Sequence, residues 1–392
     1  MKLRILVSFL LLFVPIASAQ RYTITDLGPL SPTAINAWGQ VVGNLNNGHA
    51  FIWTQFTGAR DLGTLPGGTS SSAAGINDLG AVTGTADGPG TVVSYDPSLS
   101  PSQECSDLTQ PFVWTPYNGM KGLGAVEPPV FYLEFTGQLW CQVPFYGTSI
   151  NIPGEVVGYT SAYPDLYQWS LQWTNSAGMS LFGGTFTPTV VNEISNTGQI
   201  VGQNSTDEIG QATSWKNGVA TALLNLGAGT DLFYTSSANG VNDRGQVVGW
   251  STTIPFYPDC DLDLVGCPIH AVLWSEKGAI LDLGTLPGDT LSSASNISFF
   301  GQVIGSSGNT IVEQGFGGPG GSGFDGEGGV IAVVGRPFLW TKLGGMRDLN
   351  TLISKEGWVL KSATGINFWG QIVGSGTLHG QTHGFLLTPT FF

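Results

Sequence analysis

One ten-residue phrase returns seven times along the chain, and this repetition limits the possible folds more than any other feature. Each copy has Ile or Val, then Asn or Ser, two free residues, Gly, one further residue, an apolar pair or near pair, and a second Gly. The copies read AINAWGQVVG, GINDLGAVTG, SINIPGEVVG, EISNTGQIVG, GVNDRGQVVG, NISFFGQVIG and GINFWGQIVG. A fixed repeat of this kind predicts similar units that bury one continuous core between neighbours.

The phrase itself predicts a β-hairpin. The β-branched residue favours a strand, the Asn or Ser side chain can bond the backbone two residues on, and the first Gly can take a positive φ. An aromatic strand follows each hairpin, as in HAFIW at residues 49–53, and Trp closes six of the seven. A phrase with Leu-Gly or a near equivalent comes next, as in DLGTLPG from Asp61. Each unit therefore contains four short strands.

The two ends of the chain indicate how the units are arranged. The seventh unit ends at GFLLTPTFF without a fourth strand, whereas YTITDLGPL at Tyr22–Leu30 matches the fourth-strand phrases and precedes the first unit. An N-terminal strand that completes the last unit closes a ring without free edges, and a β-solenoid would not need it. We therefore predict an all-β protein: a seven-bladed β-propeller of four-stranded blades, in which residues 22–30 complete the last blade.

The N-terminus predicts export. MKLRILVSFLLLFVPIASAQ has basic residues, a short apolar run and an Ala-x-Ala ending, which are the features of a secretory signal peptide. The apolar run is shorter than the roughly 20 residues that span a bilayer. We expect residues 1–19 to be cleaved and residues 20–392 to form a single propeller domain. The product would be secreted, extracellular or periplasmic, with no transmembrane anchor after cleavage.

Charge narrows the possible partners. The formal net charge is −14, which disfavours nucleic acid and anionic lipid surfaces as partners. Only 10% of the residues are charged, so the surface is mostly neutral and polar. Such a surface suits carbohydrate, a cell-surface polymer or a protein partner, and we expect a monomer.

Four cysteines in an exported chain are expected to form disulfides. Cys260 and Cys267 are close neighbours, which favours pairing them with each other and pairing Cys105 with Cys141. Three connectivities are possible for four cysteines, and spacing does not exclude the other two.

Insertions predict which face binds a ligand. Ten residues separate Gly43 from Trp53, whereas thirty-five separate Gly305 from Trp340, and strand alternation places the variable connections on one face. Insertions gathered on one face of a repeat scaffold usually mark its binding face. Aromatic residues in and beside two insertions are the predicted ligand contacts: Phe131, Tyr132, Phe135, Trp140, Tyr146, Tyr163 and Trp169. The alternative is that these side chains form a small core under a long loop.

No cofactor is expected, with calcium as the one candidate ion. Asp259, Asp261 and Asp263 alternate in an oxygen-rich loop that suits calcium, although Leu264 stands where an EF-hand requires Gly. His49, His270 and His383 open the third strand of their units, and this recurrence predicts a repeated structural hydrogen bond. On the innermost strands, Glu193 and Asn296 replace the usual small residue and are expected to point into the channel.

The phrases HAFIW, DLGTLPGG and GINDLGAVTG together resemble those of the bacterial extracellular HAF-repeat family, over nearly the whole chain after residue 20. The resemblance implies an exported repeat protein and brings no catalytic residues with it. Many members end in a Pro-Glu-Pro sorting tail, whereas this chain ends in TPTFF.

No catalytic motif is present, so we predict a binding or scaffolding module that acts through its insertion-bearing face rather than an enzyme, and we assign no catalytic residue. Carbohydrate or a cell-surface polymer is the expected ligand. One alternative is a polysaccharide hydrolase or lyase that uses carboxylates on that face. Another is a purely structural envelope protein.

Overall fold

The computed structural model describes the chain over most of its length. The described residues are 21–93, 103–126, 143–162, 167–182, 189–206, 209–227, 234–254, 268–314, 330–354 and 356–390. Within these ranges nearly all regular structure is β-strand, and the exception is the short 3-10 helix η2 (Leu349–Leu352). No helix in the described ranges is long and apolar enough to cross a membrane. The predicted signal peptide, residues 1–19, lies outside the described residues.

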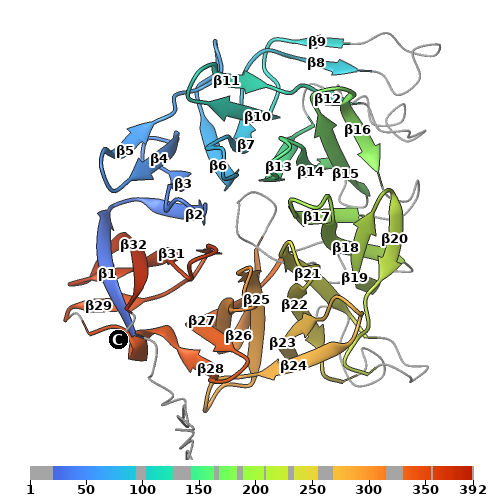
Figure 1. The fold of residues 1–392 in the computed structure, drawn as a ribbon. Helices are drawn as coiled ribbons and strands as arrows, with labels where there is room; N and C mark the ends of the chain where they lie inside the picture. The colour runs from blue at the N-terminus through green and yellow to red at the C-terminus, as the bar shows by residue number, and fades with distance from the viewer. Residues whose placement is uncertain are drawn as a thin grey trace, which may run out of the picture.

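The strands form sheets arranged around a central axis as a β-propeller (Figure 1). Five sheets contain four strands each in simple succession: β2 (Ser31–Ile35), β3 (Val41–Asn44), β4 (Ala50–Thr54), β5 (Gly58–Asp61); β13 (Phe145–Ile150), β14 (Val156–Ala162), β15 (Tyr167–Thr174), β16 (Gly178–Phe182); β17 (Thr189–Ile194), β18 (Ile200–Thr206), β19 (Ile209–Lys216), β20 (Val219–Ala222); β21 (Ser236–Val241), β22 (Val247–Thr252), β23 (Ile269–Trp274), β24 (Ile280–Gly284); β25 (Leu291–Ile297), β26 (Val303–Gln314), β27 (Val330–Thr341), β28 (Gly345–Asp348).

Three further sheets depart from this succession: β6 (Ser71–Ile76), β7 (Val82–Ala86), β10 (Gln110–Thr115), β11 (Gly119–Gly122); β8 (Gly90–Val93), β9 (Gln103–Cys105), β12 (Ala125–Val126); β29 (Trp358–Leu360), β30 (Gly365–Ile366), β31 (Ile372–Leu378), β32 (Gln381–Thr390), β1 (Arg21–Gly28). The prediction of seven blades is wrong in number, because the described residues form eight sheets. Seven of them contain one copy of the repeat phrase each. The eighth is the three-stranded sheet β12-β8-β9, built from insertion residues that the repeat phrase does not cover.

The predicted closure by the N-terminal strand is confirmed. Strand β1 pairs antiparallel with β32, with Tyr22 opposite Pro389 and Ile24 opposite Leu387. The first strand of the chain therefore forms the outer edge of the last sheet (Figure 1). Hydrogen bonds between the two ends of the chain thus complete the ring.

The hydrophobic core lies between neighbouring sheets. In one cluster Val42 and Ile52 from one sheet pack with Phe112 and Trp114 from the next. The aromatic third strand supplies several of the largest buried side chains, including Phe51, Phe112, Phe338 and Phe385. These rings explain the aromatic phrase of the repeat, because each fills the space between two twisted sheets.

Both glycines of the repeat phrase meet a specific requirement. The first has a positive φ in all seven copies, as at Gly154 with φ 87°, which confirms the predicted turn. The second has ordinary backbone angles but lies against the innermost strand. A Cβ on Gly158 would collide with the backbone carbonyl of Tyr146, and the equivalent glycines face the same obstacle. Two strands approach too closely here for any side chain.

The Asn of the repeat phrase joins one sheet to the next. The Asn36 side-chain oxygen accepts from the N–H groups of Trp38 and Gln40 within its own turn. Its Nδ2 donates to the backbone oxygen of Asn77 in the neighbouring sheet, at 3.0 Å. We call this inter-sheet bond the Asn tie. Five copies of the phrase form it: Asn36, Asn77, Asn151, Asn242 and Asn367. Ser195 and Ser298 occupy the other two positions and have no amide to donate.

A second ring of inter-sheet hydrogen bonds starts from a β-bulge in the innermost strand. The residue two positions before the Ile or Val is skipped in the strand register, as Thr33 is between Pro32 and Ala34. Its hydroxyl donates to the backbone oxygen of Ala73 in the next sheet, at 2.9 Å. A bulge redirects a side chain in this way. The same link is made by Thr148, Asn192, Asn239, Ser295 and Thr364.

Candidate ligand-binding channel

The innermost strands surround a central cavity of about 670 Å³. All seven sheets that contain the repeat phrase contribute to its wall, mainly with Asn, Ser, Thr and small residues. No Lys, Arg or His is among the described residues that line it. Four carboxylates do line it: Asp78, Asp87, Glu193 and Asp243. The channel is therefore polar and acidic, and it disfavours anionic ligands.

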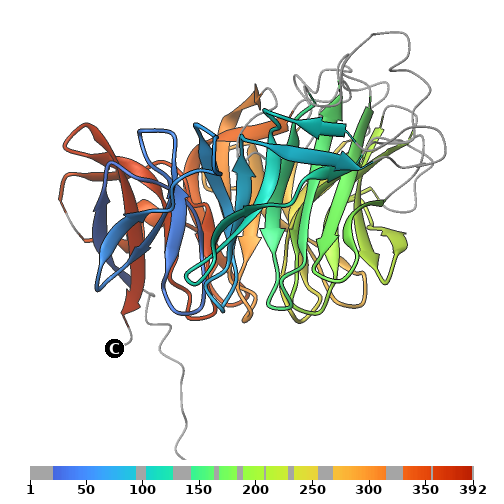
Figure 2. The same cartoon turned by 90° about the horizontal axis from the view of Figure 1, so that it is seen from above.

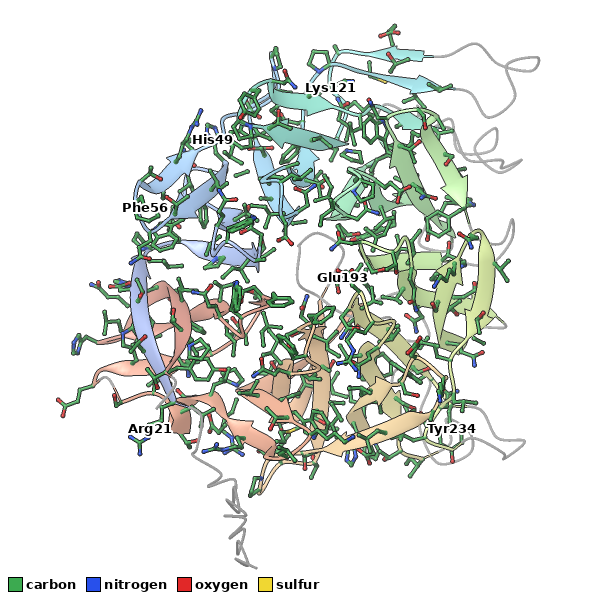
Figure 3. All side chains as sticks on the ribbon, in the orientation of Figure 1. Arg21, His49, Phe56, Lys121, Glu193 and Tyr234 are labelled. Carbon is green, nitrogen blue, oxygen red and sulfur yellow. The ribbon has the colours of Figure 1, made fainter. Side chains whose placement is uncertain are left out.

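Glu193 is the most unusual of these carboxylates, and it extends into the channel as predicted (Figure 3). Its Oε2 accepts from the backbone N–H of Val241 at 2.9 Å, and its Oε1 accepts from Asn296 Nδ2 at 3.5 Å. Gly240 lies between them, and a Cβ there would sit 3.2 Å from Glu193 Oε2. The small residue of one sheet thus makes room for the long residue of its neighbour.

The environment of Glu193 shifts the pKa of its carboxyl group. Its pKa is raised from 4.5 to about 7, mainly by burial and also by the charge of Asp243, while the hydrogen bonds from Val241 and Asn296 offset part of this rise. The side chain is half-buried, so it keeps contact with the channel while protein atoms surround it. A carboxyl group with this pKa can give or take a proton near neutral pH.

Tyr146 and Tyr159 form an aromatic pair on the channel wall near the insertion-bearing mouth. They lie opposite each other on β13 and β14, with ring centroids 5.1 Å apart and an interplanar angle of 35°. Burial raises the pKa of Tyr146, and burial together with the neighbouring Tyr146 raises the pKa of Tyr159 to about 12. Both phenols therefore stay neutral at physiological pH and can donate or accept hydrogen bonds.

The structure separates the two described members of the predicted aromatic site. Tyr146 lines the channel, whereas Trp169 is only 5% exposed and packs with Val92 and Phe145. The prediction for Trp169 is corrected, because the small sheet covers its ring and leaves no face for a ligand. The other predicted contacts lie outside the described residues: Phe131, Tyr132, Phe135, Trp140 and Tyr163.

The predicted metal and disulfide residues fall mostly outside the described ranges. Asp259, Asp261 and Asp263 all lie there, so the calcium site stays a prediction. Cys105 is buried in β9 and is not a free thiol. Cys141, Cys260 and Cys267 lie outside the described residues, and the predicted pairing therefore stays a prediction.

The three recurring histidines have the predicted structural role. His49 Nδ1 lies 2.9 Å from Asp61 Oδ2, His270 Nδ1 lies 2.9 Å from Asp282 Oδ2, and His383 Nδ1 lies 2.8 Å from Asp26 Oδ1. Each pair joins the third strand, or for His49 the residue just before it, to the strand outside it. The last pair includes the N-terminal strand, so the closing sheet has the same link as the others.

Sequence reasoning missed the residues that tie the sheets together around the channel. The position two before the Ile or Val holds Thr, Ala, Thr, Asn, Asn, Ser and Thr in chain order. Six of these seven can donate a hydrogen bond, and this alternation of a short donor with a small residue was the available signal. Because these side-chain donors already bond the backbone of the next sheet, a ligand would have to bind neighbouring polar groups of the channel wall.

Comparisons with known proteins give the fold but no family. No protein-family model matches the sequence, and no curated protein matches it. Among solved structures, the chain is similar to an oligogalacturonate lyase in complex with manganese, at 10% identity over 95% of this chain and 94% of that chain, with a TM-score of 0.50. Virginiamycin B lyase from Staphylococcus aureus shares 10% identity over 93% and 99%, with a TM-score of 0.48. A gluconolactonase from Xanthomonas campestris shares 8% over 95% and 91%, with a TM-score of 0.40. At these identities the similarity concerns the fold alone.

Proposed function

We propose that this protein is a secreted binding module that holds a neutral carbohydrate in its central channel. The observation that supports this most directly is the Tyr146–Tyr159 pair on the wall of a cavity whose described lining includes no cationic side chain. An aromatic ring offers an apolar face to the C–H groups of a sugar, and neutral phenols exchange hydrogen bonds with hydroxyl groups.

The remaining channel wall fits the same class of ligand. It presents amide and hydroxyl groups, which pair with sugar hydroxyls without needing a charge. Ser293 is among the residues that line the cavity, and its buried hydroxyl has no hydrogen-bond partner among the described residues. A buried polar group without a partner is costly, and a small side-chain shift that let a ligand hydroxyl reach it would satisfy it.

The test is a calorimetric titration of residues 20–392 with soluble oligosaccharides. We expect Tyr146→Ala to weaken the binding of any hit at least tenfold, which corresponds to about 1.4 kcal/mol. Tyr146→Phe keeps the ring and should retain most of the affinity, and Lys277→Ala, at an outer turn, should leave it unchanged. Equal affinity of Tyr146→Ala and the unchanged protein would remove the channel from consideration.

A second candidate function is hydrolysis of a neutral polysaccharide, because the channel contains a carboxyl group with a pKa of about 7 beside a second acid, Asp243. Paired acids with separated pKa values are the usual basis of general acid and base roles in glycoside hydrolysis. Product release from oligosaccharides that is lost in Glu193→Gln would support this function. If bound oligosaccharides stay intact at every pH from 5 to 8, the protein binds without catalysis.

A further inference from the structure

The face formed by the hairpin turns of the blades is divided into an apolar and a polar part. Each repeat phrase leaves two free residues at its turn, and in four neighbouring sheets these include large apolar side chains. Trp38 is 76% exposed, Leu79 72%, Phe300 61% and Trp369 62%. In two of the remaining three sheets the same positions hold Asn196-Thr197 and Asp243-Arg244, and in the third they hold Ile152-Pro153, of which Ile152 is only 38% exposed.

The outer turns of the same face repeat this division. The turns between third and fourth strands expose Phe56, Tyr117 and Leu343 almost completely, and these belong to three of the same four sheets. The corresponding turns of the other sheets hold polar residues, namely Ser176, Asn217 and Lys277. We call the four neighbouring sheets' share of this face the apolar sector. Its members at the inner and outer turns are Trp38, Phe56, Leu79, Tyr117, Phe299, Phe300, Leu343, Phe368 and Trp369.

The inner side chains of the apolar sector are held in place. Phe368 contacts Phe299 and Phe300 of the preceding sheet, with centroid distances of 5.2 Å and 4.9 Å, and Trp369 at 5.0 Å. Trp38 donates its Nε1–H to the backbone oxygen of Asp78 at 2.9 Å. The one polar atom of this exposed indole is thus already satisfied, and only its apolar ring is available to a partner.

The apolar sector is also level. The same turn geometry sets the height of each inner turn, because every copy has its first Gly at positive φ. Figure 2 shows the turns of this face ending near one level. Turns at one level carry the exposed side chains as a broad array rather than a pocket, and within it Phe368 meets Phe300 and Trp369 edge to face, at interplanar angles of 61° and 76°.

We propose that the apolar sector is a platform that binds the flat face of a neutral, insoluble polysaccharide. Sugar rings in such a polymer present repeated C–H faces in one plane, which match level, pre-positioned aromatic rings at low entropic cost. The sector borders the channel mouth, since Phe299 and Phe368 also line the cavity. The proposal rests on the proposed function for the class of ligand. It adds a second binding surface, on the face opposite the insertion-bearing mouth near which Tyr146 and Tyr159 lie.

Two other occupants fit less well. A membrane surface is disfavoured by the net charge of −14 where its lipids are anionic, and rings packed against one another do not project as an inserting wedge. A large apolar protein surface would have to cover the polar channel rim, where Asp78 and Asp243 occupy free turn positions. A polysaccharide offers hydroxyl groups to that rim as well as C–H faces to the rings.

The experiment measures depletion of the full chain from solution by microcrystalline cellulose, by chitin and by insoluble xylan. The double variant Trp38→Ala/Trp369→Ala should lose at least tenfold in affinity for the polymer that binds. Thr197→Ala and Lys277→Ala occupy corresponding turns in the polar part and should stay within twofold. Binding by the double variant equal to that of the unchanged protein, or no binding to any of the polymers, would overturn the proposal. So would Trp-dependent flotation with phosphatidylcholine vesicles in the absence of polymer binding.

The soluble-sugar titration keeps this proposal separate from the proposed function. Loss of polymer binding in the double variant with normal binding of soluble oligosaccharides supports both sites. If Tyr146→Ala loses binding of soluble oligosaccharides and the polymer still depletes Trp38→Ala/Trp369→Ala normally, the channel is supported and the platform is overturned. If Tyr146→Ala binds soluble oligosaccharides normally and Trp38→Ala/Trp369→Ala is no longer depleted by the polymer, the platform is supported and the channel is overturned.

Discussion

The two ends of the blades are held together by different means. At the turn end, Asn ties run from one sheet to the next, and the donating side chains are almost fully buried, as at Asn77. At the insertion end, the repeated link is a His–Asp pair within one sheet, and Asp61 of such a pair is 42% exposed. A buried hydrogen bond is costly to remove, whereas an exposed ion pair contributes little. The constant residues of the repeat therefore mark attachment between sheets, and ligand contacts are to be sought at the positions that the repeat leaves free.

The largest effect is expected where two strands touch. Gly158→Ala places a Cβ against the backbone carbonyl of Tyr146, and backbone cannot move aside as a flexible side chain can. We expect a loss of more than about 3 kcal/mol in the free energy of unfolding, or failure to fold. Gly278→Asn is the matched control, because Gly278 has φ 82° with open space around it and Asn tolerates this conformation. Chemical denaturation measures both, and a Gly158→Ala cost as small as that of the control would contradict the close approach.

The Asn ties come next in size. Asn77→Ala removes two acceptor contacts in its own turn and the bond to Asn151, so we expect a cost of about 2–3 kcal/mol. The converse change sharpens the comparison. Ser298→Asn supplies the missing amide at a junction between two sheets that has no Asn tie. This change should raise the free energy of unfolding by about 0.5–1 kcal/mol. Thermal and urea denaturation of both variants test this, and a destabilising Ser298→Asn would show that this junction is shaped for Ser.

The repeat phrase predicted most of the fold because its constraints are local. A β-branched residue, a turn amide and a left-handed Gly act within ten residues, and the closing strand could be matched by its own phrase at Tyr22–Leu30. The eighth sheet could not be predicted, because β12 pairs parallel with β8 across a long separation in sequence. No local pattern marks such a pairing. The burial of Trp169 fits the alternative of a small core under the loop, although the sheet that contributes to this core was not predicted.

The candidate sites were predicted less well than the fold. Glu193 was found because it breaks the run of small residues on the innermost strands, and the structure places it in the channel. The apolar sector was missed because ligand contacts were predicted only on the insertion-bearing face, whereas the spacing of the turns on the opposite face is uniform. Uniform spacing describes the backbone only. The side chains at free positions such as Trp38 and Trp369 vary independently, and comparing these positions alone would have revealed the sector.

Glu193 provides an intermediate effect with a distinct pH dependence. Its pKa is raised to about 7 in the folded protein from an ordinary 4.5, so the folded state binds the proton more tightly. Its contribution to stability is therefore fully present below pH 4.5 and is lost as the pH rises to about 7. Solvent in the channel screens the group, and we expect a fall of about 1–2 kcal/mol over this range. Glu193→Gln should remove this fall and be more stable than the unchanged protein at pH 8. Melting temperatures from pH 4.5 to 8 measure both proteins, and parallel profiles would contradict the shift.

The smallest effect is expected at the insertion end. Burial raises the pKa of Asp61, but hydrogen bonds from Gly63, His49 and Asn47 outweigh it and lower the pKa below 3.8. The contribution of this carboxylate is thus present above pH 3.8 and is lost as the pH falls below it. Because the pair is exposed, Asp61→Asn should cost about 0.5 kcal/mol at pH 7 and less at pH 3. Asp282→Asn, in the equivalent pair, should behave alike. A cost above about 2 kcal/mol in either variant would mean that the insertion end is held as firmly as the turn end, and the contrast between the two ends would then fail.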